Sequence, residues 1–322
     1  MPYKILTNVA VKDTSTVDLT SVKTSLLVIT VNKDTLKDAA FKAIDKASKG
    51  FLKNSISSHL KEEGSSLLLP RVNGVEAESI LMVKALEADA PLHKWLGSLK
   101  SITKQANKIK AKDISLLLSS SLPQGKDIFW VIENTAKTIE SNAYIFTETK
   151  NKTVKNPTLK KLVIYGNDLT GSDLKKAKES AKKGFAIGEG VNTAKYLGDL
   201  PANHATPKII EKKVKAMTKD FPSLKIKSFN EKDLAKLGMG SYLSVSKGSD
   251  EPPRMMVIEY KGGKASEKPI ALVGKGITFD TGGVSLKPPQ GMDEMKWDMC
   301  GAATVFGVMS TLARLNAKVN VV

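Results

Sequence analysis

Hydrophobic and polar positions alternate along the first half of the chain in a way that predicts strands and helices in turn. A run rich in β-branched residues predicts a buried strand at residues 25–31, and further short strands are predicted at residues 66–69, 79–84, 115–119 and 143–146. Between these runs, apolar residues recur at helical spacing and predict helices at residues 34–52, 91–111 and 126–141. This alternation is typical of an α/β domain with a mixed or parallel sheet.

A polar stretch at residues 148–161 has the composition of a linker or surface crossing. Beyond it, the sequence predicts a long helix from Thr170 or Ser172 to about Leu197, and a helix over 207–219 with Pro207 in its first turn. Strands are predicted at residues 162–165, 224–229, 254–260, 270–273 and 319–322, and a helix of small residues at 301–315. We therefore expect two α/β domains, at residues 1–160 and 161–322.

Composition narrows the class of protein. The chain has 322 residues, 41% hydrophobic and 26% charged, which is ordinary for a protein that forms a core. No apolar run approaches the roughly 20 residues that span a bilayer, and no secretory signal is readable, so we expect no membrane partner. The single cysteine, Cys300, excludes an intrachain disulfide and fits a reducing, cytoplasmic location. The three histidines are scattered, and no HExxH motif occurs.

The formal net charge is +17, and most of the excess is lysine spread along the whole chain. Such an excess can attract nucleic acid. However, the lysine runs contain no interleaved aromatic residues, so we interpret them as solvated helix faces and loops and assign no nucleic-acid site. A DNA-binding or regulatory protein remains the alternative function. A nucleotide-binding or ADP-ribose-binding module is less favoured, because no glycine-rich phosphate loop precedes residue 160.

The segment most informative about chemistry follows the predicted strand at 270–273. A glycine-dense loop there carries Lys275, Asp280 and Lys287, and Asp298 precedes the helix of small residues. Glycine lets a backbone approach a ligand closely, and carboxylates on such loops suit divalent cations. Two such cations can generate a hydroxide nucleophile from water. Taken singly, each aspartate could instead cap a turn or a helix, and Lys275 could form a salt bridge.

The combination of motifs resembles the leucyl (cytosol) aminopeptidase family. The resemblance rests on residues 273–303, on Tyr-Leu-Gly-Asp-Leu-Pro-Ala-Asn at 196–203 with Thr-Pro at 206–207, and on segments 237–240 and 248–254. It is specific from about residue 185 onward and only architectural before that. It implies an N-terminal macrodomain-like α/β sandwich, followed by the first part of an α/β/α metallopeptidase domain.

The resemblance implies a role for each polar residue of the loop. Lys275, Asp280 and Asp298 would bind two divalent ions, Mn²⁺ or Zn²⁺, with Asp280 bridging both ions and contacting the substrate. Lys275 would bind as a neutral amine, which requires a lowered pKa. Lys287 would stay charged, contact the substrate and stabilise the oxyanion of the intermediate. Met295 would line the pocket for the first side chain of the substrate, although it could equally fill the core.

The same resemblance implies an aminopeptidase that releases N-terminal residues such as leucine from peptides, assembled as a homo-hexamer. The family pattern continues with an Asn-Thr-Asp-Ala-Glu-Gly-Arg segment, whose arginine helps to hold a bicarbonate. These 322 residues contain no such segment. We therefore expect an incomplete, inactive chain that binds metal poorly and exposes apolar surface and an unpaired strand edge.

Overall fold

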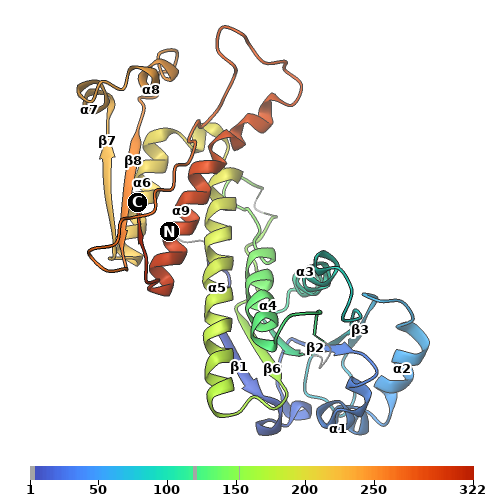
Figure 1. Cartoon of the computed structure of the whole chain (residues 1–322). Helices are drawn as coiled ribbons and strands as arrows, with labels where there is room; N and C mark the ends of the chain where they lie inside the picture. The colour runs from blue at the N-terminus through green and yellow to red at the C-terminus, as the bar shows by residue number, and fades with distance from the viewer. Residues whose placement is uncertain (1–3, 119–121, 152) are drawn as a thin grey trace. The chain divides into compact units, whose positions relative to one another are not determined.

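The computed structural model describes residues 4–118, 122–151 and 153–322 (Figure 1). The chain divides into two compact units. The N-terminal unit contains residues 4–145 and 156–188, and the C-terminal unit contains residues 146–155 and 189–322. The long helix α5 (Gly171–Asp199) contributes residues to both units. The domain boundary at residue 160 stays a prediction.

The N-terminal unit is built on a six-stranded sheet with the order β1-β6-β5-β2-β4-β3. All neighbouring strands are parallel except β3, which is antiparallel to β4. The strands are β1 (Asn8–Asp13), β2 (Leu26–Val31), β3 (Ser66–Pro70), β4 (Ser79–Lys84), β5 (Asp113–Leu117) and β6 (Lys161–Gly166). The sequence did not predict β1, an edge strand that pairs with β6. Residue 119, at the end of one predicted strand, lies outside the described residues.

Helices lie on both faces of this sheet, because its central strands are apolar on both sides. Leu27 and Ile29 of β2 belong to one buried cluster with Phe41 of α1 (Ala39–Ala47) and Leu52 of α2 (Phe51–His59). On the opposite face, residues of α3 (Leu92–Lys108) and α4 (Ile128–Asn142) surround a small cavity together with Leu116 of β5. The layered α/β class predicted for this unit is therefore confirmed.

Two expectations for the N-terminal unit are wrong in detail. The helix predicted over 34–52 is interrupted at Lys49 and Gly50, whose φ angles of 56° and 79° are left-handed and end α1 before α2 begins. The strand predicted at 143–146 is absent from these residues. Ala143 instead ends α4, with its N–H donating to the Ile139 carbonyl at 3.0 Å, and Phe146 packs on the hydrophobic cluster of the C-terminal unit.

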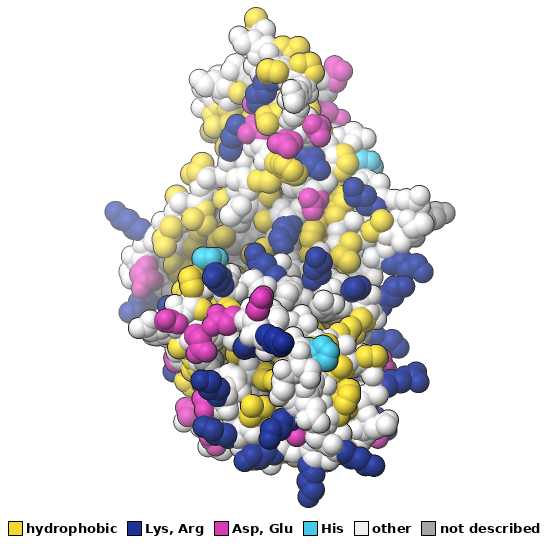
Figure 2. Space-filling model, turned by 90° about the vertical axis from the view of Figure 1, so that its right-hand side faces the viewer, with side chains coloured by type: hydrophobic (Ala, Val, Ile, Leu, Met, Phe, Trp, Pro, Cys, Tyr) yellow, Lys and Arg dark blue, Asp and Glu magenta, His cyan; other side chains and the backbone are white. Residues whose placement is uncertain are grey.

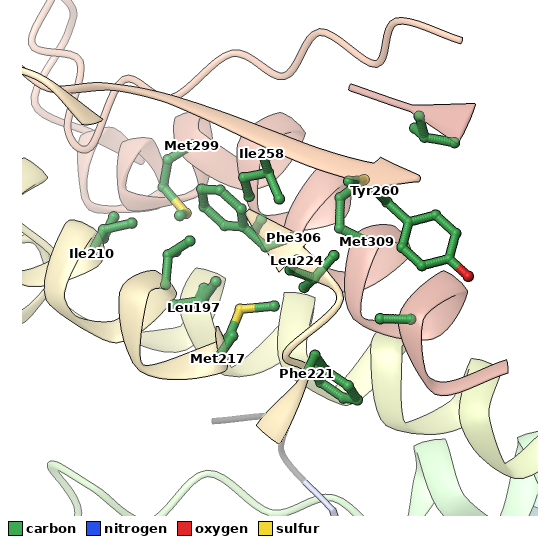
Figure 3. Close-up of a cluster of buried hydrophobic side chains, with 14 of the residues drawn as sticks. Leu197, Ile210, Met217, Phe221, Leu224, Ile258, Tyr260, Met299, Phe306 and Met309 are labelled. Carbon is green, nitrogen blue, oxygen red and sulfur yellow. The ribbon is translucent and has the colours of Figure 1, made fainter. Parts of the chain in front are cut away.

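The C-terminal unit contains a three-stranded antiparallel sheet with the order β7-β8-β9. The strands of this sheet are β7 (Leu224–Phe229), β8 (Met255–Lys261) and β9 (Asn320–Val321). The helices of the unit include α6 (Pro207–Asp220), α7 (Glu231–Lys236), α8 (Gly240–Val245) and α9 (Cys300–Leu315). Side chains from α5, α6, the strands and α9 meet in one buried cluster that includes Leu197, Met217, Ile258 and Phe306 (Figure 3). This cluster packs α9, the helix that follows the candidate site in the chain, against the sheet.

The strand predicted at residues 270–273 is reduced to one isolated parallel bridge between Ile270 and Val321. Three hydrogen bonds still align the two segments. Ile270 N–H donates to Asn320 O at 2.9 Å, Val322 N–H to Ile270 O at 2.9 Å, and Leu272 N–H to Val322 O at 2.8 Å. The apolar run therefore enters the sheet region as expected but forms no regular strand. No described helix is long and apolar enough to span a membrane.

Replacing Glu211 of α6 with glutamine should destabilise the C-terminal unit in a pH-dependent manner. The carboxylate accepts hydrogen bonds from Lys215 Nζ at 2.5 Å and Arg254 Nε at 2.7 Å, and these partners lower its pKa from 4.5 to about 2. Because the folded pKa is depressed, the stabilisation is present above the unfolded pKa and is lost as the pH falls toward about 2. Allowing for solvent screening, we expect Glu211→Gln to lower the free energy of unfolding by about 1–2 kcal/mol at neutral pH.

Urea unfolding at pH 7, 5 and 3.5 measures this effect, with the exposed Glu251→Gln as the control. The difference between Glu211→Gln and the parent chain should shrink as the pH falls. A difference that stays constant over this range would contradict the pKa argument.

Candidate metal centre

The loop after Leu272 lies against the start of α9 because two glycines allow the backbones to touch. A Cβ atom on Gly274 would lie 2.6 Å from the Gly301 carbonyl oxygen, closer than real Cβ contacts. One residue later, the Lys275 carbonyl accepts a hydrogen bond from Ala302 N–H at 2.8 Å. The backbone of Lys275 is thus fixed beside the first turn of α9. Its side chain, 59% exposed, reaches Asp298, with Nζ 2.7 Å from Oδ1.

A closed turn brings Lys287 back onto Asp280. The N–H of Gly282 donates to Asp280 Oδ1 at 2.8 Å, and the N–H of Lys287 donates to the Thr281 carbonyl at 2.9 Å. Gly282 has a φ of 96°, and a Cβ there would lie 2.4 Å from the Ser285 carbonyl oxygen, so only glycine fits this turn. As a result, Lys287 Nζ donates to Asp280 Oδ2 at 2.8 Å.

Asp298 lies on a 3-10 helix, η5 (Met292–Met299), that leads directly into α9. The helix-capping alternative for Asp298 is wrong, because Met299 is the N-cap of α9 and makes no side-chain cap bond. The capping alternative for Asp280 is partly right, since its Oδ1 accepts the Gly282 N–H. The Oδ2 atom of Asp298 is buried and has no hydrogen-bond partner among the described residues.

Each of the two aspartates is paired with a lysine, so the charges of these four side chains balance. The hydrogen bond from Lys287 lowers the pKa of Asp280, and the Gly282 amide and the charge of Lys275 add to this effect. Asp280 is therefore a carboxylate at neutral pH. The half-buried Cys300 lies nearby at the start of α9, and burial together with the charge of Asp199 raises the pKa of its thiol.

The donor set fits a divalent cation. It offers the carboxylates of Asp280 and Asp298, which suit borderline ions such as Zn²⁺ or Mn²⁺, and a lysine that could bind only after its ammonium group loses a proton. A buried carboxylate oxygen without a partner, as in Asp298, is a group that a bound cation would satisfy. Across the described ranges, no cluster of three or more His, Cys, Asp and Glu residues could hold a metal, so any site here depends on the lysine as well.

The structure pairs Lys275 with Asp298, and it brings Lys287 into contact with both Asp280 and Met295. The positive φ expected of Gly282 is confirmed, but sequence reasoning missed its hydrogen bond to Asp280 and the helix η5. The Asp-x-Gly spacing at 280–282 is the signal that could have predicted the first, because an aspartate commonly accepts the N–H two residues later. No local signal distinguished the 3-10 helix from an α-helix.

Apolar side chains are exposed around the loop, as expected. Val273 is 96% exposed and Leu286 is 67% exposed, and both flank the polar residues described above. By contrast, Lys and Arg side chains are scattered over the face that Figure 2 shows, mixed with acidic and hydrophobic residues. This distribution gives no support to the DNA-binding alternative.

The comparisons with known proteins all point to the same family. The family model described as "Cytosol aminopeptidase family, catalytic domain" matches residues 192–322, and the N-terminal domain model of the same family matches residues 27–153. A probable cytosol aminopeptidase of Aromatoleum aromaticum is 39% identical over 307 residues, which are 93% of this chain and 60% of that protein. The cytosol aminopeptidase of Pseudomonas aeruginosa is 35% identical over 309 residues, 94% of this chain and 61% of that protein.

Two solved structures share the fold. A mutant of tomato leucine aminopeptidase superposes with a TM-score of 0.76 at 22% identity, covering 98% of this chain and 61% of that one. The bottromycin maturation enzyme BotP, in complex with Mn, superposes with a TM-score of 0.68 at 21% identity, covering 92% of this chain and 58% of that one. The chain spans about three fifths of the length of the curated relatives it matches. Because models of both domains match and together cover most of its residues, the chain belongs to the cytosol aminopeptidase family.

Proposed function

We propose that this chain supplies the N-terminal domain and part of the active site of a metal-dependent aminopeptidase that releases N-terminal residues, leucine among them, from peptides. One observation carries the proposal. Two Lys–Asp pairs, Lys275 with Asp298 and Lys287 with Asp280, lie on a glycine-dense loop and the adjacent helix, and one buried oxygen of Asp298 has no hydrogen-bond partner among the described residues. The family membership supports the same reaction.

Each residue has a proposed part in that reaction. Lys275, Asp280 and Asp298 would hold the metal, with Asp280 shared between two ions. The bound ions would polarise the scissile carbonyl and lower the pKa of a water molecule. Lys287 would keep its charge and hydrogen-bond the oxygen that becomes negative, while Asp280 and Met295 would contact the substrate. Burial of the site behind bound substrate would strengthen the contact with Lys287, because screening by water falls.

Several finer points belong to the same proposal. BotP was solved in complex with Mn, which supports manganese as the first ion to test, with zinc as the second. The names of the relatives support a cytosolic location. Further ligands, bicarbonate binding and a homo-hexamer follow only from the family resemblance, and they would involve a length of protein that these 322 residues do not span.

The test uses the protein at the full length of the family, freed of metal by a chelator and reloaded with Mn²⁺. Hydrolysis of a leucine amide with a fluorescent leaving group is measured for the parent protein, for Asp298→Asn and for the matched control Asp250→Asn, an exposed aspartate of the same unit. We expect metal-dependent activity that falls at least about 100-fold in Asp298→Asn and stays unchanged in Asp250→Asn. Equal activity in the two variants, or activity that persists without metal, would overturn the proposal.

A further inference from the structure

The helix η5 presents two of its side chains to the same loop. A 3-10 helix has three residues per turn, so residues three apart lie directly above one another on one face. Met295 and Asp298 are three apart on η5. Asp298 accepts a hydrogen bond from Lys275, and Met295 contacts Lys287, with Sδ 3.0 Å from Nζ. One face of η5 thus contacts both lysines of the loop, Lys275 through Asp298 and Lys287 through Met295.

The ammonium group of Lys287 lies between a carboxylate and a thioether. A lysine ammonium has three donors and no acceptor. One donor reaches Asp280 Oδ2 at 2.8 Å and another reaches Met295 Sδ at 3.0 Å. The side chain of Lys287 is 34% exposed, so the position of its charge is not fixed by burial alone. A second acceptor on a different element adds a second restraint on the position of the ammonium.

We propose that Met295 is a positioning residue for Lys287. Its sulfur accepts a weak hydrogen bond and holds the ammonium between the loop and η5, in addition to any part its methyl group plays in an apolar pocket. The value of this contact for catalysis rests on the proposed function, since it fixes the charge that would stabilise the oxyanion. The contact itself exists without metal or substrate and can be tested on the chain as it stands.

Two substitutions separate a positioning role from that of an apolar wall. Met295→Leu keeps an apolar side chain of similar volume but removes the acceptor. Met295→Gln keeps the length of the side chain and places an amide oxygen, which is an acceptor, near the position of the sulfur. If Met295 were only an apolar wall, leucine would be harmless and glutamine would disturb the site. If Met295 holds Lys287, leucine should release the ammonium and glutamine should leave it in place.

The experiment measures how fast Lys287 is acetylated by a water-soluble activated ester at pH 8, quantified by mass spectrometry of the chain after digestion. The exposed Lys268 of the same unit is the internal reference in every sample. Loss of one acceptor should free the amine, so we expect Met295→Leu to accelerate labelling of Lys287 relative to Lys268 by about two- to tenfold. Met295→Gln should restore the rate of the parent chain to within about twofold.

Each other outcome contradicts the proposal. An unchanged rate in Met295→Leu would show that the sulfur does not restrain the ammonium. Acceleration in both variants would show that an acceptor at residue 295 does not restrain the ammonium. Melting temperatures of the three proteins confirm that each is folded before labelling. Because this readout needs neither metal nor turnover, its failure is distinguishable from a failure of the aminopeptidase assay described above.

Discussion

Replacing Lys287 with alanine in the full-length, Mn²⁺-loaded protein is expected to lower kcat by about 10²–10³-fold and to change KM much less. The reason is that an oxyanion stabiliser acts mainly where negative charge develops, in the transition state. The turn from Asp280 to Lys287 places the ammonium group 2.8 Å from the Asp280 carboxylate, beside the proposed metal ligands. The contact is both a hydrogen bond and an ion pair, so the charge of Lys287 is already directed at the site before substrate binds.

Steady-state kinetics with a leucine amide substrate tests this expectation, and Lys268→Ala is the matched control because that side chain is exposed on the same unit. Loss of kcat in Lys287→Ala alone supports the assigned role. A variant that raises KM and keeps kcat would instead assign Lys287 to ground-state binding of the substrate. In that case the oxyanion role would be wrong.

Replacing Gly190 with alanine is expected to destabilise the C-terminal unit by about 1–3 kcal/mol. Gly190 of α5 meets Gly307 and Thr311 of α9 at a point where the two helix backbones touch. A Cβ on Gly190 would lie 2.6 Å from the Gly307 carbonyl oxygen and 2.1 Å from Thr311 Oγ1. The hydroxyl could rotate away, but a backbone carbonyl in a helix cannot, so α9 itself would have to move. That movement would also disturb the buried cluster in which Phe306 and Met309 lie.

Thermal unfolding followed by circular dichroism measures the effect, at about 2–4 °C of melting temperature per kcal/mol for a unit of this size. Gly248→Ala is the control, because a Cβ at that position meets nothing within 4 Å and the residue has no left-handed φ. Alanine raises helix propensity by roughly 0.5–1 kcal/mol at a helical position. A melting temperature for Gly190→Ala at or above that of the parent would therefore mean that α5 and α9 do not touch as closely as described.

Elements with a strong local signal were predictable from the sequence. The apolar, β-branched run at β2 and the helical periodicity of α3, α4 and α6 leave few alternatives, because both patterns report which face of an element is buried. The long helix α5 was equally clear. Elements that depend on partners far away in the chain were not predictable from the sequence. β1 was missed because its register is set by β6, more than a hundred residues later in the chain.

The features of the candidate site also fall into two groups, those that the sequence predicts and those that only the structure shows. The residues that carry chemistry could be identified without a structure, because Lys275, Asp280, Lys287 and Asp298 occur together with glycines in one short stretch. The family could be identified in the same manner, since those motifs have a specific order and spacing. The pairing of each lysine with its aspartate, the contact of Met295 with Lys287 and the burial of an Asp298 oxygen became known only from the three-dimensional fold. Sequence spacing reports periodicity within one element, whereas these contacts depend on how a loop and two helices pack against each other.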